Sequence, residues 1–217
     1  MSLTVPPIRS RGATFDLVRQ DVVESLMTGG EAVAPQGVAL WHYTFPLVPQ
    51  TYAEAQEWMG VLARLTKMGQ RFIAGPPGFS PPEYVKKYWT GSAWTTGTSL
   101  LGQPLMDGIN QSGETVQIKN LVAGETFLQR GDYISFENPL HGEIKVVTAD
   151  CESDSAGKAT LEFTPPLRTP NSGEDVINIV EPVTLFRLKS PQFFYNLQPN
   201  RIVNMTIEAV ESYGFDT

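Results

Sequence analysis

Large apolar side chains recur at every second position between residues 38 and 48. They are Trp41, Tyr43, Phe45 and Leu47. Because successive side chains of a strand point to opposite faces, this alternation predicts a half-buried strand with His42 and Thr44 on its other face. A second strand is predicted over residues 15–25, and the glycine-containing run 28–37 between them predicts a turn. The two strands are expected to pair as an antiparallel hairpin.

The spacing of apolar residues changes to a helical period directly after this strand. Thr51 and Glu54 match a capping box, in which Thr51 caps the first turn and Glu54 reaches back to the Thr51 amide. The apolar residues that follow form one stripe: Ala55, Trp58, Met59, Leu62 and Leu65. The pattern predicts an amphipathic helix over 52–68 that packs this stripe on a sheet and keeps its charged face in water.

Proline and glycine divide the rest of the chain into short segments. A strand is predicted over 71–74, whereas the four prolines of 75–84 argue against regular structure because proline lacks an amide hydrogen and fixes φ. Residues 88–114 are polar and glycine-rich, which is typical of a linker or an excursion. Short strands separated by turn residues follow and favour a small barrel or sandwich: 115–119, 132–137, 143–148, 159–164 and 176–181. Three further strands are predicted within 183–213.

The composition excludes several classes of protein but does not indicate a functional site. The 217 residues are 41% hydrophobic, which suffices for a buried core. The net charge of −7 argues against a nucleic-acid-binding surface, which needs clustered Lys and Arg. The single cysteine, Cys151, excludes an internal disulfide and a cysteine-based zinc site. No run approaches the ~20 apolar residues of a membrane span, and the first residues lack the apolar core of a signal peptide.

Three carboxylates alternate in a predicted turn, at Asp150, Glu152 and Asp154. Calcium loops also space their oxygen ligands by two residues. This sequence lacks the glycine at loop position six and the late bidentate glutamate of an EF-hand. A solvated turn is therefore the favoured interpretation, and no metal site is predicted.

The two histidines, His42 and His141, could each act as a base. A catalytic histidine needs a nucleophile and an orienting third group, and the sequence around neither residue marks a nucleophile. His42 is expected on a surface or an interface, and His141 in a turn. No P-loop lysine and no Gly-x-Gly-x-x-Gly fingerprint is present. No catalytic, cofactor-binding or metal-binding residue is assigned, and the chain is predicted not to be an enzyme.

The four tryptophans fall into two pairs. Trp41 and Trp58 lie on apolar stripes and are expected in the core. Trp89 and Trp94 lie in the predicted linker, where an exposed indole could stack on a sugar or pack against a neighbouring subunit. Packing against a subunit is the favoured interpretation because tryptophan is enriched at the centres of interfaces.

The order of segments along the chain is itself a pattern. The aromatic strand leads to a Thr-x-x-Glu-Ala helix start at 51–55 and to RFIAGPP at 71–77, which matches xFxxGxP. Four further segments follow: GETFLQRGDYISF (124–136), VVTADCESDSAGKATLEFTPPLR (146–168), TLFRLKSPQFFYN (184–196) and RIVNMTIEAVES (201–212). Taken in this order, over nearly the whole chain, they resemble the distal tail proteins of siphophages and gene-transfer agents.

The resemblance implies a mainly β fold in two domains. Residues 1–89 and 182–217 would form a β-sandwich "belt" domain with the 52–68 helix packed on it. Residues 90–181 would form an inserted small β-barrel, which is OB-like in some relatives. A separate C-terminal carbohydrate-binding domain is not expected.

The resemblance also implies a structural virion protein of the tail tip, or baseplate. Copies of the chain would form a hexameric ring that joins the tail tube to the hub and the tail fibres and lets DNA pass through its lumen without specific binding. Expected partners are the tail tube protein, the tape measure or hub protein and tail fibre proteins. Assembly would take place in the bacterial host cytoplasm, with no membrane insertion, cofactor or metal.

Three alternatives compete with this reading. A carbohydrate-binding tail module would use the loop of Trp89 and Trp94 with the inserted barrel. A cell-wall hydrolase is disfavoured because no nucleophile or paired carboxylates are evident. A tail terminator or head–tail adaptor would keep the virion context and the ring but change its position.

Overall fold

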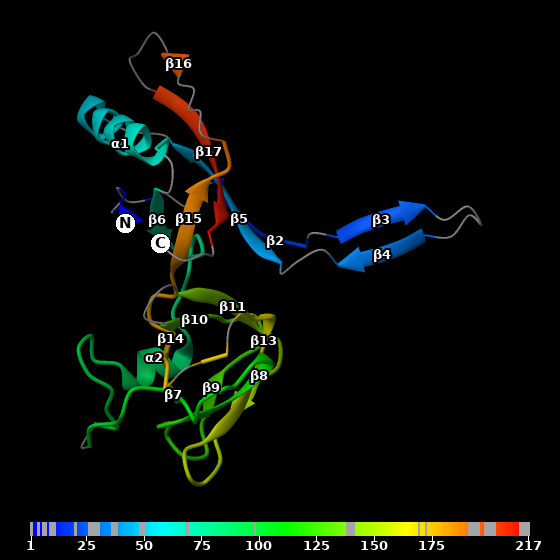
Figure 1. Cartoon of the computed structure of the whole chain (residues 1–217). Coiled ribbons are helices and arrows are strands. Elements are labelled where there is room, and N and C mark those ends of the chain that lie inside the picture. Colours follow the sequence, from blue (N-terminus) through cyan, green and yellow to red (C-terminus); the bar gives the residue numbers. More distant parts are fainter. Residues whose placement is uncertain are drawn as a thin grey trace. The chain divides into compact units, whose positions relative to one another are not determined.

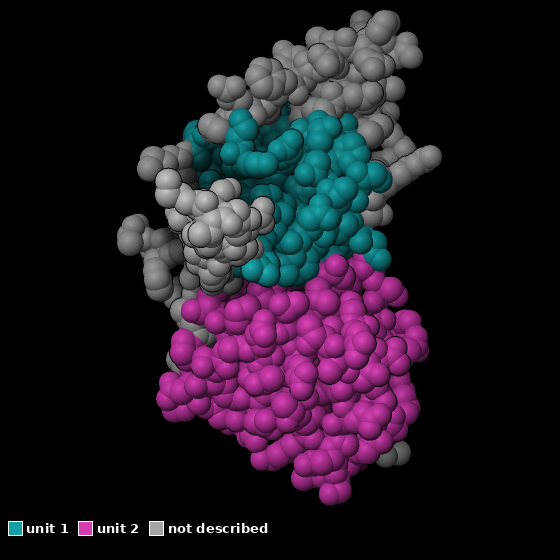
Figure 2. Space-filling view, turned by 90° about the vertical axis from the view of Figure 1, so that its right-hand side faces the viewer, with its two compact units in different colours: residues 1–78, 185–217 teal, residues 79–184 magenta. Residues whose placement is uncertain are grey.

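The computed structural model describes the chain in segments that belong to two compact units. The described residues are 2–3, 5, 8, 12–19, 21–25, 31–35, 39–47, 51–67, 70–97, 99–137, 142–168, 170–171, 173–190, 196–197 and 203–212. Unit 1 comprises Met1–Gly78 and Leu185–Thr217, and unit 2 comprises Phe79–Thr184 (Figure 2). The chain thus changes unit at 78/79 and 184/185, whereas the resemblance placed the changes at 89/90 and 181/182. The difference arises because Tyr84, Val85 and Tyr88 belong to the core of unit 2.

Unit 1 is built on one sheet that draws its strands from both ends of the chain (Figure 1). Its strands in spatial order are β1 (Ser2–Leu3), β6 (Arg71–Ala74), β15 (Thr184–Leu188), β17 (Val203–Glu211), β5 (Leu40–Leu47) and β2 (Thr14–Val18). A short strand, β16 (Asn196–Leu197), also pairs with β17. β15, β17, β5 and β2 pair antiparallel, and β1 pairs parallel to β6. The N-terminal and C-terminal segments are thereby joined through the pairing of β17 with β5.

The predicted alternation along β5 is confirmed. Trp41, Tyr43, Phe45 and Leu47 are buried, and the residues between them are partly exposed. The aromatic rings continue into neighbouring strands: the Tyr43 and Phe45 ring centroids are 4.8 Å apart, and those of Phe45 and Phe72 are 6.4 Å apart. Aromatic pairs at such distances add to the apolar area that they bury. The core of unit 1 is therefore an aromatic layer on one face of the sheet.

The predicted hairpin of the first two strands is confirmed only in part. β2 pairs antiparallel with β5, with Phe15 opposite Tyr43. The predicted strand over 15–25 is divided, because β2 ends at Val18 and a separate strand, β3 (Asp21–Ser25), pairs with β4 (Glu31–Pro35). β4 lies inside the run that was predicted as a turn, so that prediction was wrong. The residues of this run have a weak intrinsic strand propensity, so the sequence alone does not predict a strand. β4 forms because its backbone pairs with β3.

Helix α1 (Tyr52–Leu65) forms where its cap and stripe predict it. The Thr51 hydroxyl accepts a hydrogen bond from the Glu54 amide at 3.2 Å, which satisfies an amide of the first turn. The buried residues of the helix are Ala55, Trp58, Leu62 and Leu65. Trp58 meets the sheet at Phe45, with ring centroids 6.2 Å apart. The helix ends at Leu65 and not at 68, because the Thr66 hydroxyl donates to the Ala63 carbonyl (2.9 Å) and its backbone closes the last turn.

Unit 2 is a closed barrel of antiparallel strands (Figure 1). Its strands in order are β10 (Tyr133–Glu137), β11 (Glu143–Val147), β13 (Ala159–Leu167), β8 (Gly113–Lys119), β7 (Leu105–Met106) and β14 (Val176–Asn178), and β14 pairs back to β10. A two-stranded sheet, β9 (Thr126–Leu128) with β12 (Cys151–Glu152), completes it. The predicted fold class is confirmed: the chain is mainly β, with a packed helix and a small barrel inserted between the two halves of unit 1.

Two predictions for the start of unit 2 need correction. The proline-rich run 75–84 gives way to a short helix, α2 (Glu83–Tyr88), because Pro82 sits at its N-cap, where a missing amide hydrogen costs nothing. The run 88–114 is not a linker between units: it supplies Trp94 and Met106 to the barrel core and contains β7. Isolated β-bridges such as Trp89–Trp94 involve one residue on each side, so they produce no alternation of apolar residues from which the sequence could predict them. The five strands predicted after it are confirmed, with ends that differ by up to three residues.

A buried asparagine fixes the loops at one end of the barrel. The Asn171 side chain accepts from the Gln111 amide (2.7 Å) and donates to the carbonyls of Gly108 (2.7 Å) and Gly173 (2.5 Å). It therefore ties together loops that are far apart in sequence.

We expect Asn171→Ala to destabilise unit 2 by about 1–3 kcal/mol, because three partly buried backbone groups lose their hydrogen bonds to the buried Asn171 side chain. Thermal unfolding followed by circular dichroism measures this. Thr160→Val is the control: it keeps a branched side chain but removes an exposed hydrogen bond to Gln117 at 3.0 Å, and should change stability by less than about 0.5 kcal/mol. Equal losses for the two variants would contradict the role given to Asn171.

Candidate functional site

His42 lies on the outer, polar face of the sheet in unit 1. It stands between Asp16 on β2 and Val210 on β17 in the strand register. Partial burial lowers its pKa, the charge of Lys189 lowers it further, and Asp16 and Glu208 oppose both effects. His42 is therefore neutral at neutral pH, on a face that also carries an ion pair between Lys189 and Glu208 at 3.5 Å. His141 lies outside the described residues.

The carboxylates of the acidic turn are occupied by backbone amides. Asp150 accepts from the Arg130 amide at 2.8 Å. Asp154 accepts from the amides of Ala156 and Lys158 at 2.7 and 2.9 Å. These bonds shape the turn, as Asp side chains commonly do. Within the residues that the structure describes, no group of three or more His, Cys, Asp or Glu side chains is arranged to hold a metal ion.

Cys151 is buried at the start of β12. Its thiol lies 3.5 Å from the Thr160 carbonyl, and burial raises its pKa to about 11. A nucleophilic cysteine reacts as the thiolate, which this environment disfavours. Cys151 therefore acts as a small apolar core residue.

Three of the four tryptophans are buried, whereas the sequence predicted two in the core and two in a linker, where they could be exposed. Trp41 and Trp58 are buried, as predicted. Trp94 is also buried, with 6% of its surface exposed, and belongs to the core of unit 2. Only Trp89 of the pair is partly open, and its ring centroid lies 5.1 Å from that of Trp94. A surface contact through the indole is therefore available to Trp89 and not to Trp94.

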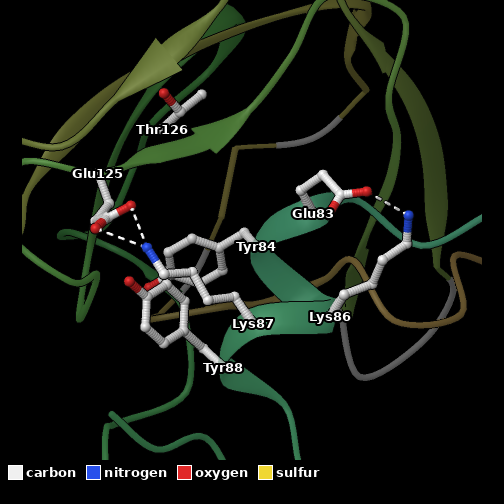
Figure 3. A pocket seen from close by; sticks show the side chains of 7 residues that line it. All are labelled: Glu83, Tyr84, Lys86, Lys87, Tyr88, Glu125 and Thr126. Carbon is white, nitrogen blue, oxygen red and sulfur yellow. Dashed lines mark hydrogen bonds and ion pairs between the residues drawn. The ribbon is translucent and has the colours of Figure 1, made fainter.

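A pocket of about 420 Å³ opens beside α2 (Figure 3). It is lined by Glu83, Tyr84, Lys86, Lys87, Tyr88, Glu125 and Thr126. Figure 3 shows Lys87 reaching from α2 to Glu125, and its ammonium lies 2.9 Å from both carboxylate oxygens. Lys86 pairs with Glu83 at 2.5 Å on the other side of the helix.

The charges of this pocket are paired and fixed. Hydrogen bonds with Tyr88 and then Glu125 raise the pKa of Lys87, and the hydrogen bond from Lys87 lowers the pKa of Glu125. Burial raises the pKa of Tyr84, whose hydroxyl accepts from the Val122 amide at 2.9 Å. The pocket therefore holds two ion pairs beside two tyrosines. The shifts of Lys87, Glu125 and Tyr84 each move the pKa away from neutrality, where a general acid or base is most effective.

Sequence reasoning missed one polar pair, in the interior of the barrel. Lys145 and Glu143 alternate on β11 and lie opposite Ile134 and Phe136, two core residues of β10. The Lys145 ammonium lies 2.6 Å from a Glu143 carboxylate oxygen and donates to the Pro166 carbonyl at 2.8 Å. The lysine side chain has no exposed surface, so the pair cannot meet a substrate. The sequence EIKVV could have indicated this pair, because its lysine lies among the apolar residues of a strand.

No protein-family model matches the chain, and no curated protein matches it either. In the part of the chain that the structure describes, neither helix is long and apolar enough to cross a membrane.

Proposed function

We propose that the chain is a structural protein of a phage tail tip, a distal tail protein whose copies form a ring. The ring, hexameric in this proposal, joins the tail tube to the hub and the tail fibres. DNA passes through its lumen without specific binding. The function lies in the surfaces that the chain offers to its neighbours.

The observation that supports this proposal most strongly is that unit 1 is built from both ends of the chain and unit 2 from the middle. The segments that resemble distal tail proteins at both ends, including 71–77 and 201–212, meet in one sheet of unit 1. The segments 124–136 and 146–168 lie in the barrel of unit 2, between them. A belt built from both ends of the chain with a barrel inserted is the arrangement that the resemblance implies. The order of the resembling segments and the division of the chain into two units therefore both support a distal tail protein.

The edges of the sheet support self-association. Among the described strands, β2 and β1 are the outermost of the unit 1 sheet. An outer strand carries backbone groups that another chain can pair with, and a closed ring of identical subunits covers such edges on every copy. Six copies with a net charge of −7 each would carry roughly −42, which favours passage of DNA over its adsorption to the lumen.

The purified chain is expected to form annular particles of about six subunits. Size-exclusion chromatography with light scattering gives the mass, and negative-stain imaging shows the central opening. A chain that stays monomeric over the accessible concentration range, with and without its tail partners, would rule out the ring.

Labelled antibody on intact virions separates the tail tip from other ring positions. Label at the distal end of the tail supports the proposal. Label at the head–tail junction would identify a tail terminator or an adaptor. A zymogram with cell-wall substrate tests the hydrolase alternative, and a cleared zone would overturn a purely structural role.

A further inference from the structure

We infer that unit 2 carries a contact site for a neutral glycan on the Trp89 loop, defined as the described residues 89–97 and 99–104. This site goes beyond the ring proposal and does not depend on it. The inference rests on the fixed backbone of the loop, on the exposure of its side chains and on its lack of charge.

The backbone of the Trp89 loop is held by hydrogen bonds along its length. The Thr90 amide donates to the Ala93 carbonyl (3.0 Å), and the Thr95 amide donates to the Tyr88 carbonyl (2.9 Å). Further along, the Leu101 amide donates to the Trp94 carbonyl at 2.8 Å. A loop fixed in this way loses little conformational entropy when a ligand binds.

The indole of Trp89 is supported from inside the barrel. Its ring lies against Trp94, which is buried, and Trp89 packs on the edge of the unit 2 core. Trp89 itself is only partly buried. A tryptophan held by the core with part of its ring open presents apolar surface at a small entropic cost. The C–H face of a sugar ring is a ligand for such a surface.

The residues of the Trp89 loop itself supply hydrogen-bonding groups without charge; the nearest charges in the sequence, such as Lys87, lie on α2 and are paired. The exposed polar side chains of the described loop are Thr90, Ser92, Thr96, Ser99 and Gln103. Leu100 adds an apolar side chain that is 83% exposed. From Tyr88 to Met106 the sequence contains no Asp, Glu, Lys, Arg or His, although 18% of the whole chain is charged.

These properties select the chemistry of the ligand. A charged ligand, such as a nucleic acid or an acidic peptide, would leave its charge without a partner on this loop. A neutral polyhydroxylated ligand matches both the exposed hydroxyl groups and the partly exposed Trp89. The structure therefore favours a glycan of neutral hexose or N-acetylhexosamine units over an anionic polysaccharide.

The test uses an array of immobilised neutral oligosaccharides, with sialylated and uronate-containing oligosaccharides as charged counterparts. The intact chain is expected to bind members of the neutral set, and Trp89→Ala to lower the affinity roughly tenfold or more. Tyr52→Ala removes a 62% exposed aromatic residue of unit 1 and serves as the matched control, with unchanged binding expected. Absence of binding to every neutral glycan, or equal binding by Trp89→Ala, would overturn the inference.

Acrylamide quenching tests the same contact without relying on the folding of the variant. Trp41, Trp58 and Trp94 are buried, so Trp89 is the indole that the quencher reaches most readily. A bound neutral glycan is expected to protect this fluorescence in the wild-type chain. Binding without protection would place the glycan elsewhere. Because both measurements use the isolated chain in any oligomeric state, failure of the ring proposal would leave their outcome unaffected.

Discussion

Replacing Lys145 by methionine is expected to lower the free energy of unfolding of unit 2 by about 3–5 kcal/mol. The change leaves the Glu143 carboxylate in the barrel interior without the ammonium that lies 2.6 Å from it. The Pro166 carbonyl also loses its hydrogen bond at 2.8 Å. The carboxylate also accepts from the Arg168 amide at 3.3 Å, a long hydrogen bond that does not replace the ion pair. A buried charge that loses its partner is among the largest single-residue penalties.

The double variant Lys145→Met with Glu143→Leu gives the sharper test. Removing both charges also removes the cost of burying them, so the double variant should recover most of the lost stability and could exceed the wild type. Lys86→Met is the control in the same unit, because its ion pair with Glu83 is exposed on both sides and should contribute less than about 1 kcal/mol. Urea titration followed by circular dichroism measures all three. A Lys145→Met variant as stable as Lys86→Met would refute the burial of the pair.

Local patterns in this sequence predicted those elements whose signal lies within a few neighbouring residues. The alternation from Trp41 to Leu47 and the cap at Thr51 each depend on side-chain spacing, and both appear where predicted. β4 and α2 were missed because they depend on contacts with segments outside their own local sequence. β4 is held by its pairing with β3, and α2 by the burial of Tyr84 and Tyr88 in the barrel, and neither interaction is visible in the local sequence.

The candidate sites were harder to predict than the fold. The spacing of Asp150, Glu152 and Asp154 resembles that of calcium ligands, although a solvated turn was the favoured interpretation; the Asp150 and Asp154 oxygens accept hydrogen bonds from backbone amides. Trp89 and Trp94 were predicted as an equivalent pair, yet one is in the core and the other is partly open. Sequence fixes which groups are present, whereas tertiary packing decides which of them face water. The Lys145–Glu143 pair was missed because lysine is almost never fully buried unless it is paired.

Trp58→Ala is expected to destabilise unit 1 by about 3–5 kcal/mol and to prevent assembly of the ring. Trp58 is 4% exposed and meets Phe45 with ring centroids 6.2 Å apart. Truncation leaves a cavity between α1 and the aromatic layer of the sheet, and the surrounding structure can collapse into it only partly. Because the stability of a typical domain is about 5–15 kcal/mol, such a loss consumes much of it.

The consequence for assembly follows from where the ring contacts are proposed to lie. The outer strands of the unit 1 sheet can pair with a neighbouring copy only while that sheet is folded, so partial unfolding removes the subunit from the ring. Tyr52→Ala on the same helix is the matched control, since Tyr52 is 62% exposed and its loss should change stability by no more than about 0.5 kcal/mol. Circular dichroism during heating and light scattering on the same samples separate unfolding from loss of assembly. A Trp58→Ala chain that keeps wild-type stability would show that the helix does not pack on the sheet through this residue, and one that unfolds at lower temperature yet still forms rings would move the subunit contacts away from unit 1.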